Sequence, residues 1–315
     1  MIRLTRSQFL AGAAASLLGT QARAQNFPTR PIRMVIGFAP GGIVDFTARS
    51  ITQALGDLAG QSVVAENRTG GGGVVGTDYV AKAAPDGYTL LISDPSITVN
   101  PSLQPNLPYD LLRDIRAVAI VSSSPLVAVV PAALPINTLA ELAAYGRATP
   151  GGLTYVSPGA GTMTHKSAEI FGQRAGMEAT AVVYRGVGAA FPDLLAGRVH
   201  YVFSGIPGVS AMIEAGQLRP LATTGETRSA SLPNVPTALE AGFPDFVFDL
   251  WTGVFAPAAT PDAIVNRIAS LLQESLQRPD TIAALARAGA APRFRGPAEA
   301  QAFFRAETER WSRPA

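Results

Sequence analysis

The sequence predicts a two-domain α/β protein. Short apolar runs suited to buried strands alternate with helical patterns, which favours parallel sheets covered by helices. Glycine-rich turns repeatedly separate a strand from the helix that follows, as in βα units. The chain has 315 residues, 47% of them hydrophobic and 15% charged, which is enough for the cores of roughly two domains.

Residues 1–24 predict a secretory signal peptide. A positive start with Arg3 and Arg6, an apolar segment at 9–19 and the cleavage signal Ala22-Arg23-Ala24 follow one another in order. We expect export and cleavage near Ala24. The segment carries three arginines and no acid, so the mature chain keeps 22 Lys and Arg residues against 23 acids. This balance, without basic runs interleaved with aromatics, does not indicate nucleic-acid binding.

The first strand and helix are predicted at 32–49. The apolar run 32–36 has the length of a buried strand, and Gly41 and Gly42 permit a tight turn after it. From Ile43 the apolar residues, Phe46 among them, recur at helical spacing. The helix start directs free N–H groups and a positive dipole end outward, which suits an anion.

The remaining elements follow from the same patterns. We expect a loop at 100–108. We expect further strands at 61–67, 88–93, 115–121, 126–130, 153–157, 181–184, 199–203, 218–223 and 250–255. We expect a helix that follows the glycine loop at 68–76 and ends at 84. Further helices are expected at 109–116, 139–147, 162–176, 187–196, 208–216, 262–277, 280–288 and 297–311. Asn137 or Thr138 should cap the helix at 139–147.

Several loops share one design, in which a strand leads through glycines or serines to a helix start. In open α/β sheets such loops line one crevice at the carboxyl ends of the strands. Two domains facing each other would give a cleft rich in N–H groups and hydroxyls, which suits a small carboxylate. Arg185 could add a bidentate contact, or be a solvated arginine. Phe38 and Trp251 could line the cleft, or belong to the core. The loops lie at 38–45, 67–76, 93–98, 157–165, 185–188 and 204–208.

Two enzymatic interpretations remain as alternatives. Gly71, Gly73 and Gly76, followed by Asp94 after the next strand, match a dinucleotide fingerprint and would suit an NAD-dependent oxidoreductase. A hydrolase would need His165 as base, with Ser157 upstream, but no serine has a nucleophile-elbow motif. The absence of cysteine excludes thiolate chemistry and disulfides, and two histidines are too few for a histidine metal site. The preferred interpretation is a non-enzyme without metal or cofactor.

Eight motifs in chain order carry a resemblance to a known family. They are FAPGGIVDFTAR (38–49), VAENRTGGGG (64–73), PDGYTL (85–90), YVSPGAGT (155–162), VYRG (183–186), DLLAG (193–197), LPNVPT (232–237) and WTGVFAP (251–257). With these motifs the chain resembles the Bug-type (TctC-like) solute receptors of tripartite tricarboxylate transporters over most of residues 28–311.

The resemblance implies a type II-like periplasmic binding protein with two mixed, mostly parallel sheets, a two-strand hinge and a central cleft. We divide it into domain I at 27–124 and 238–315 and domain II at 125–237. It implies a monomeric periplasmic receptor that closes on a small carboxylate and delivers it to a permease, which some family members lack. The expected ligand contacts are Phe38, Ala39, Gly41, Gly42, Asp45, Ser93, Asp94, Pro95, Ser157, Ala160, Gly161, Thr162, His165, Arg185, Ser204 and Trp251.

The chain departs from the family pattern at two positions near the expected cleft. Relatives usually carry an acid after the DLLAG helix and another at the end of the following strand. Here these places read Val199-His200 and Phe203-Ser204. We therefore expect a carboxylate without an amine, or an aromatic acid with a neutral body, as the ligand.

Overall fold

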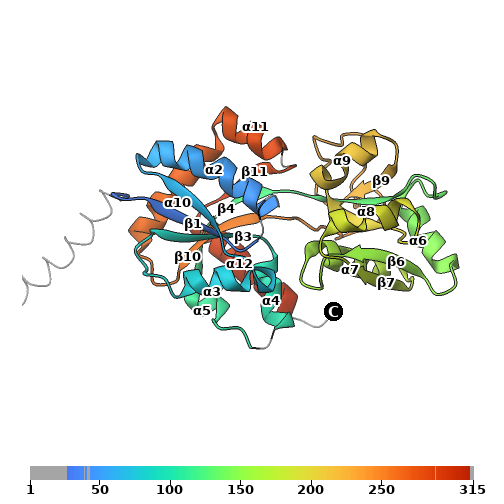
Figure 1. Ribbon diagram of the computed structural model, residues 1–315, viewed down its shortest axis with the longest axis horizontal. Helices are drawn as coiled ribbons and strands as arrows, with labels where there is room; N and C mark the ends of the chain where they lie inside the picture. Colours follow the sequence, from blue (N-terminus) through green and yellow to red (C-terminus); the bar gives the residue numbers. More distant parts are fainter. Residues whose placement is uncertain (1–26, 39, 41–42, 105, 288, 313–315) are drawn as a thin grey trace, which may run out of the picture.

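The structure is a computed structural model that describes residues 27–38, 40, 43–104, 106–287 and 289–312. These residues form two lobes joined by crossing segments of chain (Figure 1). The first lobe contains the beginning and the end of the described chain, and the second contains its middle. The signal peptide predicted at 1–24 lies outside the described residues.

The first lobe contains a six-stranded sheet of order β11-β4-β10-β3-β1-β2. β1 pairs in parallel with β2 and β3, whereas β10 runs antiparallel to its neighbours β3 and β4. β11 is also antiparallel to β4, so the sheet is mixed, as expected, but three of its five pairings are antiparallel and the prediction of a mostly parallel sheet was wrong. Its strands are β1 (Ile32–Ile36), β2 (Val63–Asn67), β3 (Thr89–Ser93), β4 (Ile115–Ser123), β10 (Thr252–Pro257) and β11 (Ala291–Arg295).

Helices cover both faces of this sheet. On one face α2 turns Val44, Ala48, Ile51 and Leu55 into a core shared with β1 and α10. Phe46 was predicted in this apolar stripe but is 53% exposed, because its position points away from the sheet. The helices are α2 (Ile43–Ala59), α3 (Val74–Ala81), α4 (Ser96–Leu103), α5 (Leu111–Asp114), α10 (Asp262–Leu276), α11 (Pro279–Arg287) and α12 (Pro297–Ser312), with a 3-10 turn η1 (Gly71–Gly73) before α3.

The second lobe contains the three-stranded sheet β8-β5-β9 and the parallel pair β6-β7. A parallel bridge between Tyr155 and Tyr201 connects the two. Its core is a cluster of aromatic rings around Phe171. The strands are β5 (Leu126–Pro131), β6 (Leu153–Ser157), β7 (Ala179–Val183), β8 (Val202–Gly205) and β9 (Leu218–Thr223), and the helices are α6 (Leu139–Ala148), α7 (Met163–Ala175), α8 (Val187–Leu195) and α9 (Ile206–Glu214).

Three local predictions were wrong. The loop expected at 100–108 begins as the last turn of α4, which accommodates Pro101. The helix expected at 109–116 is only α5, because the chain is already extended as β4 from Ile115. The strand expected at 199–203 begins as β8 at Val202, after a turn in which Gly197 has φ 71°.

The crossing segments connect the two apolar cores. β4 ends at Ser123 in the first lobe, and β5 begins at Leu126 in the second. On the return, Phe246 and Phe248 still belong to the core around Phe171, and β10 starts at Thr252 in the first lobe. Both connections are thus only a few residues long. Across the described residues, none of the helices combines the length and apolar character that crossing a bilayer requires.

The start of α6 offers a test of local helix stabilisation. Thr138 is its N-cap and accepts a hydrogen bond from the Glu141 N–H at 3.1 Å. Thr138→Ala should therefore lower the free energy of unfolding by about 0.5–2 kcal/mol, as measured by urea unfolding. Thr227→Ala, which changes an exposed loop threonine, serves as the control. Equal losses in the two variants would contradict a capping role.

Candidate functional site

The two sheets present their carboxyl edges to each other. β3 ends at Ser93, which pairs with Gly253 beside the point where the chain returns from the second lobe. The outgoing crossing segment enters the second lobe at Leu126, which pairs with Gly205 at the carboxyl end of β8. β6 and β7 run in the same direction as β8. The strand–helix loops of both lobes therefore meet around the crossing segments.

The lobes approach each other closely at two points. A Cβ atom placed on Gly161, in the β6–α7 loop, would lie 3.1 Å from Leu103 Cδ1 of α4. A Cβ atom on Gly289, after α11, would lie 2.4 Å from Pro207 at the start of α9. Glycine at these positions therefore allows an approach that a larger side chain would hinder.

A buried polar network fixes the β1–α2 loop of the first lobe. Asp45 is only 3% exposed and accepts hydrogen bonds from Arg49 Nε at 3.0 Å and Asn67 Nδ2 at 2.9 Å. Asn67 Nδ2 also donates to the Phe38 carbonyl at 2.9 Å. Asp45 thus anchors the loop. Ala39, Gly41 and Gly42, which we expected to contact a ligand, lie outside the described residues.

The glycines of the dinucleotide fingerprint have packing roles. A Cβ atom on Gly76 would lie 2.9 Å from Gly37 Cα, and one on Gly73 would lie 3.2 Å from Phe38 Cζ. α3 can therefore pack directly against the end of β1. Asn100 Nδ2, from α4, donates to the Gly72 carbonyl at 2.9 Å and fixes the turn from the other side.

The end of β3 brings a carboxyl group to the shared edge. Ser93 is buried, and Asp94 Oδ1 accepts a hydrogen bond from the Ser96 N–H at 2.9 Å at the start of α4, beside Pro95. Burial raises the pKa of Asp94, and the opposing effects come from hydrogen bonds to Ser96 and its own backbone. Among the described residues no charged group opposes this effect of burial, so Asp94 is more easily protonated than an exposed aspartate.

The end of β6 joins Ser157 to His165 of α7. Ser157 Oγ accepts a hydrogen bond from the Gly159 N–H at 3.1 Å and shares a hydrogen bond with His165 Nδ1 at 2.8 Å. Thr162 caps α7 by accepting from the His165 N–H at 3.3 Å. Burial lowers the pKa of His165, although Glu169 acts in the opposite direction. A neutral His165 thus holds the loop that contains Ala160 and Gly161.

This pair does not form a hydrolase nucleophile. Ser157 is 0% exposed and already has two hydrogen-bond partners. The other ring nitrogen, His165 Nε2, lies 3.9 Å from Glu169 Oε2, whose closer partner is Lys166 Nζ at 2.8 Å. A nucleophile must reach its substrate, so the Ser157–His165 contact is a loop support.

The remaining expected contacts differ in accessibility. Arg185 follows β7, whose end pairs with Ser157, and it is exposed with no hydrogen bond or ion pair in the described part of the chain. Ser204, near the end of β8, is buried and donates to the Gly205 carbonyl at 3.2 Å. Trp251 is 2% exposed; its ring packs against Phe303 and its Nε1 lies 3.4 Å from Glu307 Oε2, both in α12.

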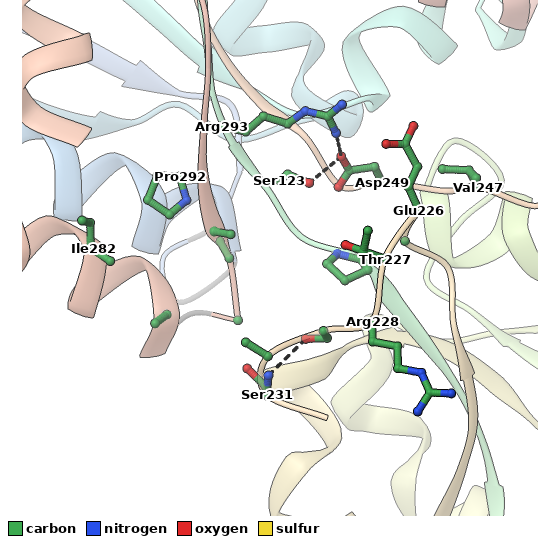
Figure 2. A pocket seen from close by; sticks show the side chains of 18 residues that line it. Ser123, Glu226, Thr227, Arg228, Ser231, Val247, Asp249, Ile282, Pro292 and Arg293 are labelled. Atoms are coloured by element: carbon green, nitrogen blue, oxygen red, sulfur yellow. Dashed lines mark hydrogen bonds and ion pairs between the residues drawn. The ribbon is translucent and has the colours of Figure 1, made fainter. Parts of the chain in front are cut away.

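The structure contains a pocket beside the crossing segments that the sequence did not predict. This pocket of about 410 Å³ lies between α11 and β11 of the first lobe and loop 225–231 of the second (Figure 2). Asp249 and Arg293 form an ion pair on its wall, with Ser123 beside them. The signal available in the sequence was Asp249, a lone acid within the apolar run 246–251.

Comparison with known proteins gives consistent results along the whole chain. The model of a family described as "Tripartite tricarboxylate transporter family receptor" matches residues 47–314. Protein BugT of Bordetella pertussis is 38% identical over 315 residues, covering 99% of this chain and 97% of that protein. A protein in the tcbD-tcbE intergenic region of Pseudomonas sp. strain P51 is 37% identical, covering 99% and 94%.

Solved structures share the fold. Rpa4515 of R. palustris with adipate superposes with a TM-score of 0.81 at 35% identity, covering 90% of this chain and 96% of that chain. MatC of Rhodopseudomonas palustris with bound malate gives 0.77 at 30% identity, covering 91% and 99%. The two-lobed architecture is therefore that of periplasmic binding proteins.

Proposed function

Because the chain belongs to the Bug-type TctC family of tripartite tricarboxylate transporter receptors, we propose that it binds a small carboxylate between the two sheet edges. It would close on this ligand by a hinge motion and deliver it to a membrane permease of the tripartite tricarboxylate transporter type. Membership of a substrate-binding receptor family supports a periplasmic receptor role over an enzymatic one.

The facing carboxyl edges carry this proposal. α2, α7, α8 and α9 all begin where a strand of one lobe ends. Helix starts present N–H groups and the positive end of the helix dipole, so they can bind an anion without a fixed countercharge. Arg185 adds an accessible cation from the second lobe. The expected ligand contacts can thus act together only if the ligand lies between the lobes.

The proposed ligand is an amine-free carboxylate. Two structural relatives are described with adipate and with malate, both dicarboxylates. The two places near the second-lobe edge where the family resemblance leads us to expect acids read Val199-His200 and Phe203-Ser204 here. Because burial raises the pKa of Asp94, its ionised form is disfavoured relative to an exposed aspartate, which weakens its attraction for an ammonium group.

We propose a hinge at the two crossing segments. The predicted domains, 27–124 with 238–315 and 125–237, divide the chain at the outgoing crossing. For the return crossing we propose residues 249–251, because Ala238, Phe246 and Phe248 share the apolar core of the second lobe. The mature receptor would begin after Ala24, reside in the periplasm and act as a monomer.

Thermal unfolding of residues 25–315 tests the function. The panel holds adipate, malate, tricarboxylates, aromatic acids, amino acids and NAD. A ligand that binds only the folded protein stabilises it by about 2.7 kcal/mol at a hundredfold excess over its dissociation constant. We expect a raised melting temperature with one group of amine-free acids. A shift with NAD alone would instead support a dinucleotide site.

Asp94 should make ligand affinity depend on pH. Its neutral carboxyl can donate a hydrogen bond to a ligand carboxylate, whereas its ionised form repels that group. Because burial raises its pKa, the neutral form persists to higher pH than in a free aspartate, and affinity should fall as pH rises through this pKa. The same sign holds for its contribution to folding, which is complete at low pH and lost as pH rises through the raised pKa.

Asp94→Asn isolates this effect. Asparagine keeps an N–H donor and does not titrate, so adipate affinity should lose the pH dependence due to position 94. Any remaining dependence then belongs to the groups that the variant leaves unchanged, which include His165 and the carboxyl groups of adipate itself. Calorimetric titrations across the pH range measure both proteins. Identical pH profiles would exclude Asp94 as the titrating group.

A further inference from the structure

We propose that Asp249 clamps the two crossing segments to each other and to the first lobe. The lobes then pivot at two points beside this residue, at Pro125 and at the peptide that joins Phe248 to Asp249. This inference rests on the proposed hinge motion and assigns its mechanical centre. With the pivot at these points, the width of the pocket in Figure 2 depends on the angle between the lobes.

Asp249 joins the crossing segments through both carboxylate oxygens. Its Oδ1 accepts a hydrogen bond from the Ser124 N–H at 2.9 Å, and its Oδ2 accepts one from Ser123 Oγ at 2.6 Å. The Leu250 N–H donates to the Ser124 carbonyl at 2.9 Å, and Pro125 and Asp249 form an antiparallel bridge. The two segments are therefore coupled and cannot bend independently.

The same carboxylate fixes this unit to the first lobe. Arg293 of β11 donates from NH1 to Asp249 Oδ2 at 3.0 Å (Figure 2). Arg293 lies between Pro292 and Arg295, where the register of β11 against β4 shifts, and this irregularity leaves it out of the regular ladder. Ser124 Oγ also donates to the Gly289 carbonyl at 2.8 Å. Residues 123–124 and 249 thus belong mechanically to the first lobe.

Fixation to the second lobe begins at the adjoining residues. Thr224, which follows β9, accepts a hydrogen bond from the Leu126 N–H through Oγ1 at 2.9 Å. Its carbonyl accepts from the Phe248 N–H at 3.0 Å. Leu126 and Phe248 are therefore held by the second lobe. Between the two hydrogen-bonded sets lie Pro125 and the peptide joining Phe248 to Asp249, while the side chain of Leu250 still packs against the second-lobe core, so rotation concentrates at these two points.

The pocket beside the pivot has one wall in each lobe. Ile282, Ala286 and Pro292 line it from the first lobe, and Glu226 and Arg228 line it from the second. Ser123, Pro125 and Asp249 lie where the walls meet. Rotation at Pro125 must move the two walls relative to each other. During this motion the clamp keeps the first-lobe wall fixed to the crossing segments.

The clamp fixes the geometry of the crossing segments. Burial raises the pKa of Asp249, and the donors Ser123, Arg293 and Ser124 offset this only in part. A buried, paired carboxylate can select one arrangement among several, and its removal leaves its partners without their acceptor. Loss of Asp249 should therefore widen the range of angles between the lobes and also lower the free energy of unfolding.

Pulsed electron resonance between two spin labels tests the clamp without any ligand. The chain has no cysteine, so Gln53→Cys on α2 and Gln173→Cys on α7, both exposed, give one label per lobe. In this background Asp249→Ala should broaden the distance distribution between the labels. Arg293→Gln should broaden it less, because the Ser123 and Ser124 contacts remain. Asp262→Ala, which removes an exposed ion pair with Arg116, is the matched control and should leave the distribution unchanged.

The outcomes separate the clamp from the proposed function. A distribution for both Asp249→Ala and Arg293→Gln as narrow as that of the unchanged receptor would overturn the clamp, even if the receptor binds its carboxylate normally. Broadening in the ligand-free variants supports it, whether or not any acid of the thermal panel binds. If Asp249→Ala does not fold, Arg293→Gln and Ser123→Ala decide the question by the same measurement.

Discussion

Replacing Phe171 by alanine should lower the free energy of unfolding by about 3–5 kcal/mol, because the change leaves a cavity in the centre of the second lobe. Phe171 is 0% exposed. Its ring centroid lies 5.3 Å from that of Phe243, 5.7 Å from Phe203, 6.0 Å from Phe246 and 6.1 Å from Tyr201. These four rings come from two segments, around β8 and in the loop at 243–246, and they cannot all move into the vacated space.

Urea unfolding followed by circular dichroism measures this loss. Phe46→Ala is the matched control, since it makes the same chemical change at a position that is 53% exposed. The control should alter the free energy of unfolding by no more than about 0.5 kcal/mol. Losses of similar size in the two variants would be inconsistent with the aromatic core described above.

Replacing Gly161 by tryptophan should weaken ligand binding by about a hundredfold or more, equivalent to about 2.7 kcal/mol. Gly161 faces α4 of the other lobe, with a Cβ position only 3.1 Å from Leu103 Cδ1. A tryptophan there would hold the lobes apart, so a ligand bound to one edge could not reach the other. Folding should change little, because Gly161 is partly exposed in the β6–α7 loop and the lobes can separate there without disturbing either core.

Calorimetric titration with adipate and malate measures this effect. Gln173→Trp adds the same ring to an exposed position on α7 of the same lobe, and should leave affinity unchanged. Melting temperatures of both variants show whether they fold. Undiminished affinity in a folded Gly161→Trp receptor would indicate that the ligand does not need both lobes together.

Local sequence patterns predicted the regular elements well. β1 and β6 have the predicted bounds, and α7 lies between its cap Thr162 and Gly176, which adopts the left-handed conformation of a C-terminal cap. These elements depend on interactions within a few residues, which a sequence shows directly.

Elements with unusual local chemistry were missed. α4 carries Pro101 in its interior, so its sequence suggested a loop, yet packing and its contacts with the glycine turn at 71–73 maintain the helix. β11 contains Pro292 and shifts register against β4, so it lacks a regular alternating pattern. Tertiary contacts define both elements, and local propensity does not.

The sequence predicted which strand–helix loops share an edge, but not the contacts or accessibility of their side chains. The strand ends indicated which loops share an edge, because parallel strands end together. They could not show that Ser157 supports His165, that Asp45 is bound by Arg49 and Asn67, or that Trp251 packs against α12. Such pairings join residues that the sequence separates. For the same reason the Asp249–Arg293 contact was not foreseen.

Calorimetric titration of residues 25–315 with the acids of the thermal panel tests the central proposal most directly. We predict saturable binding of one molecule per chain for one group of amine-free carboxylates, with no product formed, and loss of this binding in Gly161→Trp. Preferential binding of an amino acid, turnover of any panel member, or absence of binding by every acid tested would contradict it.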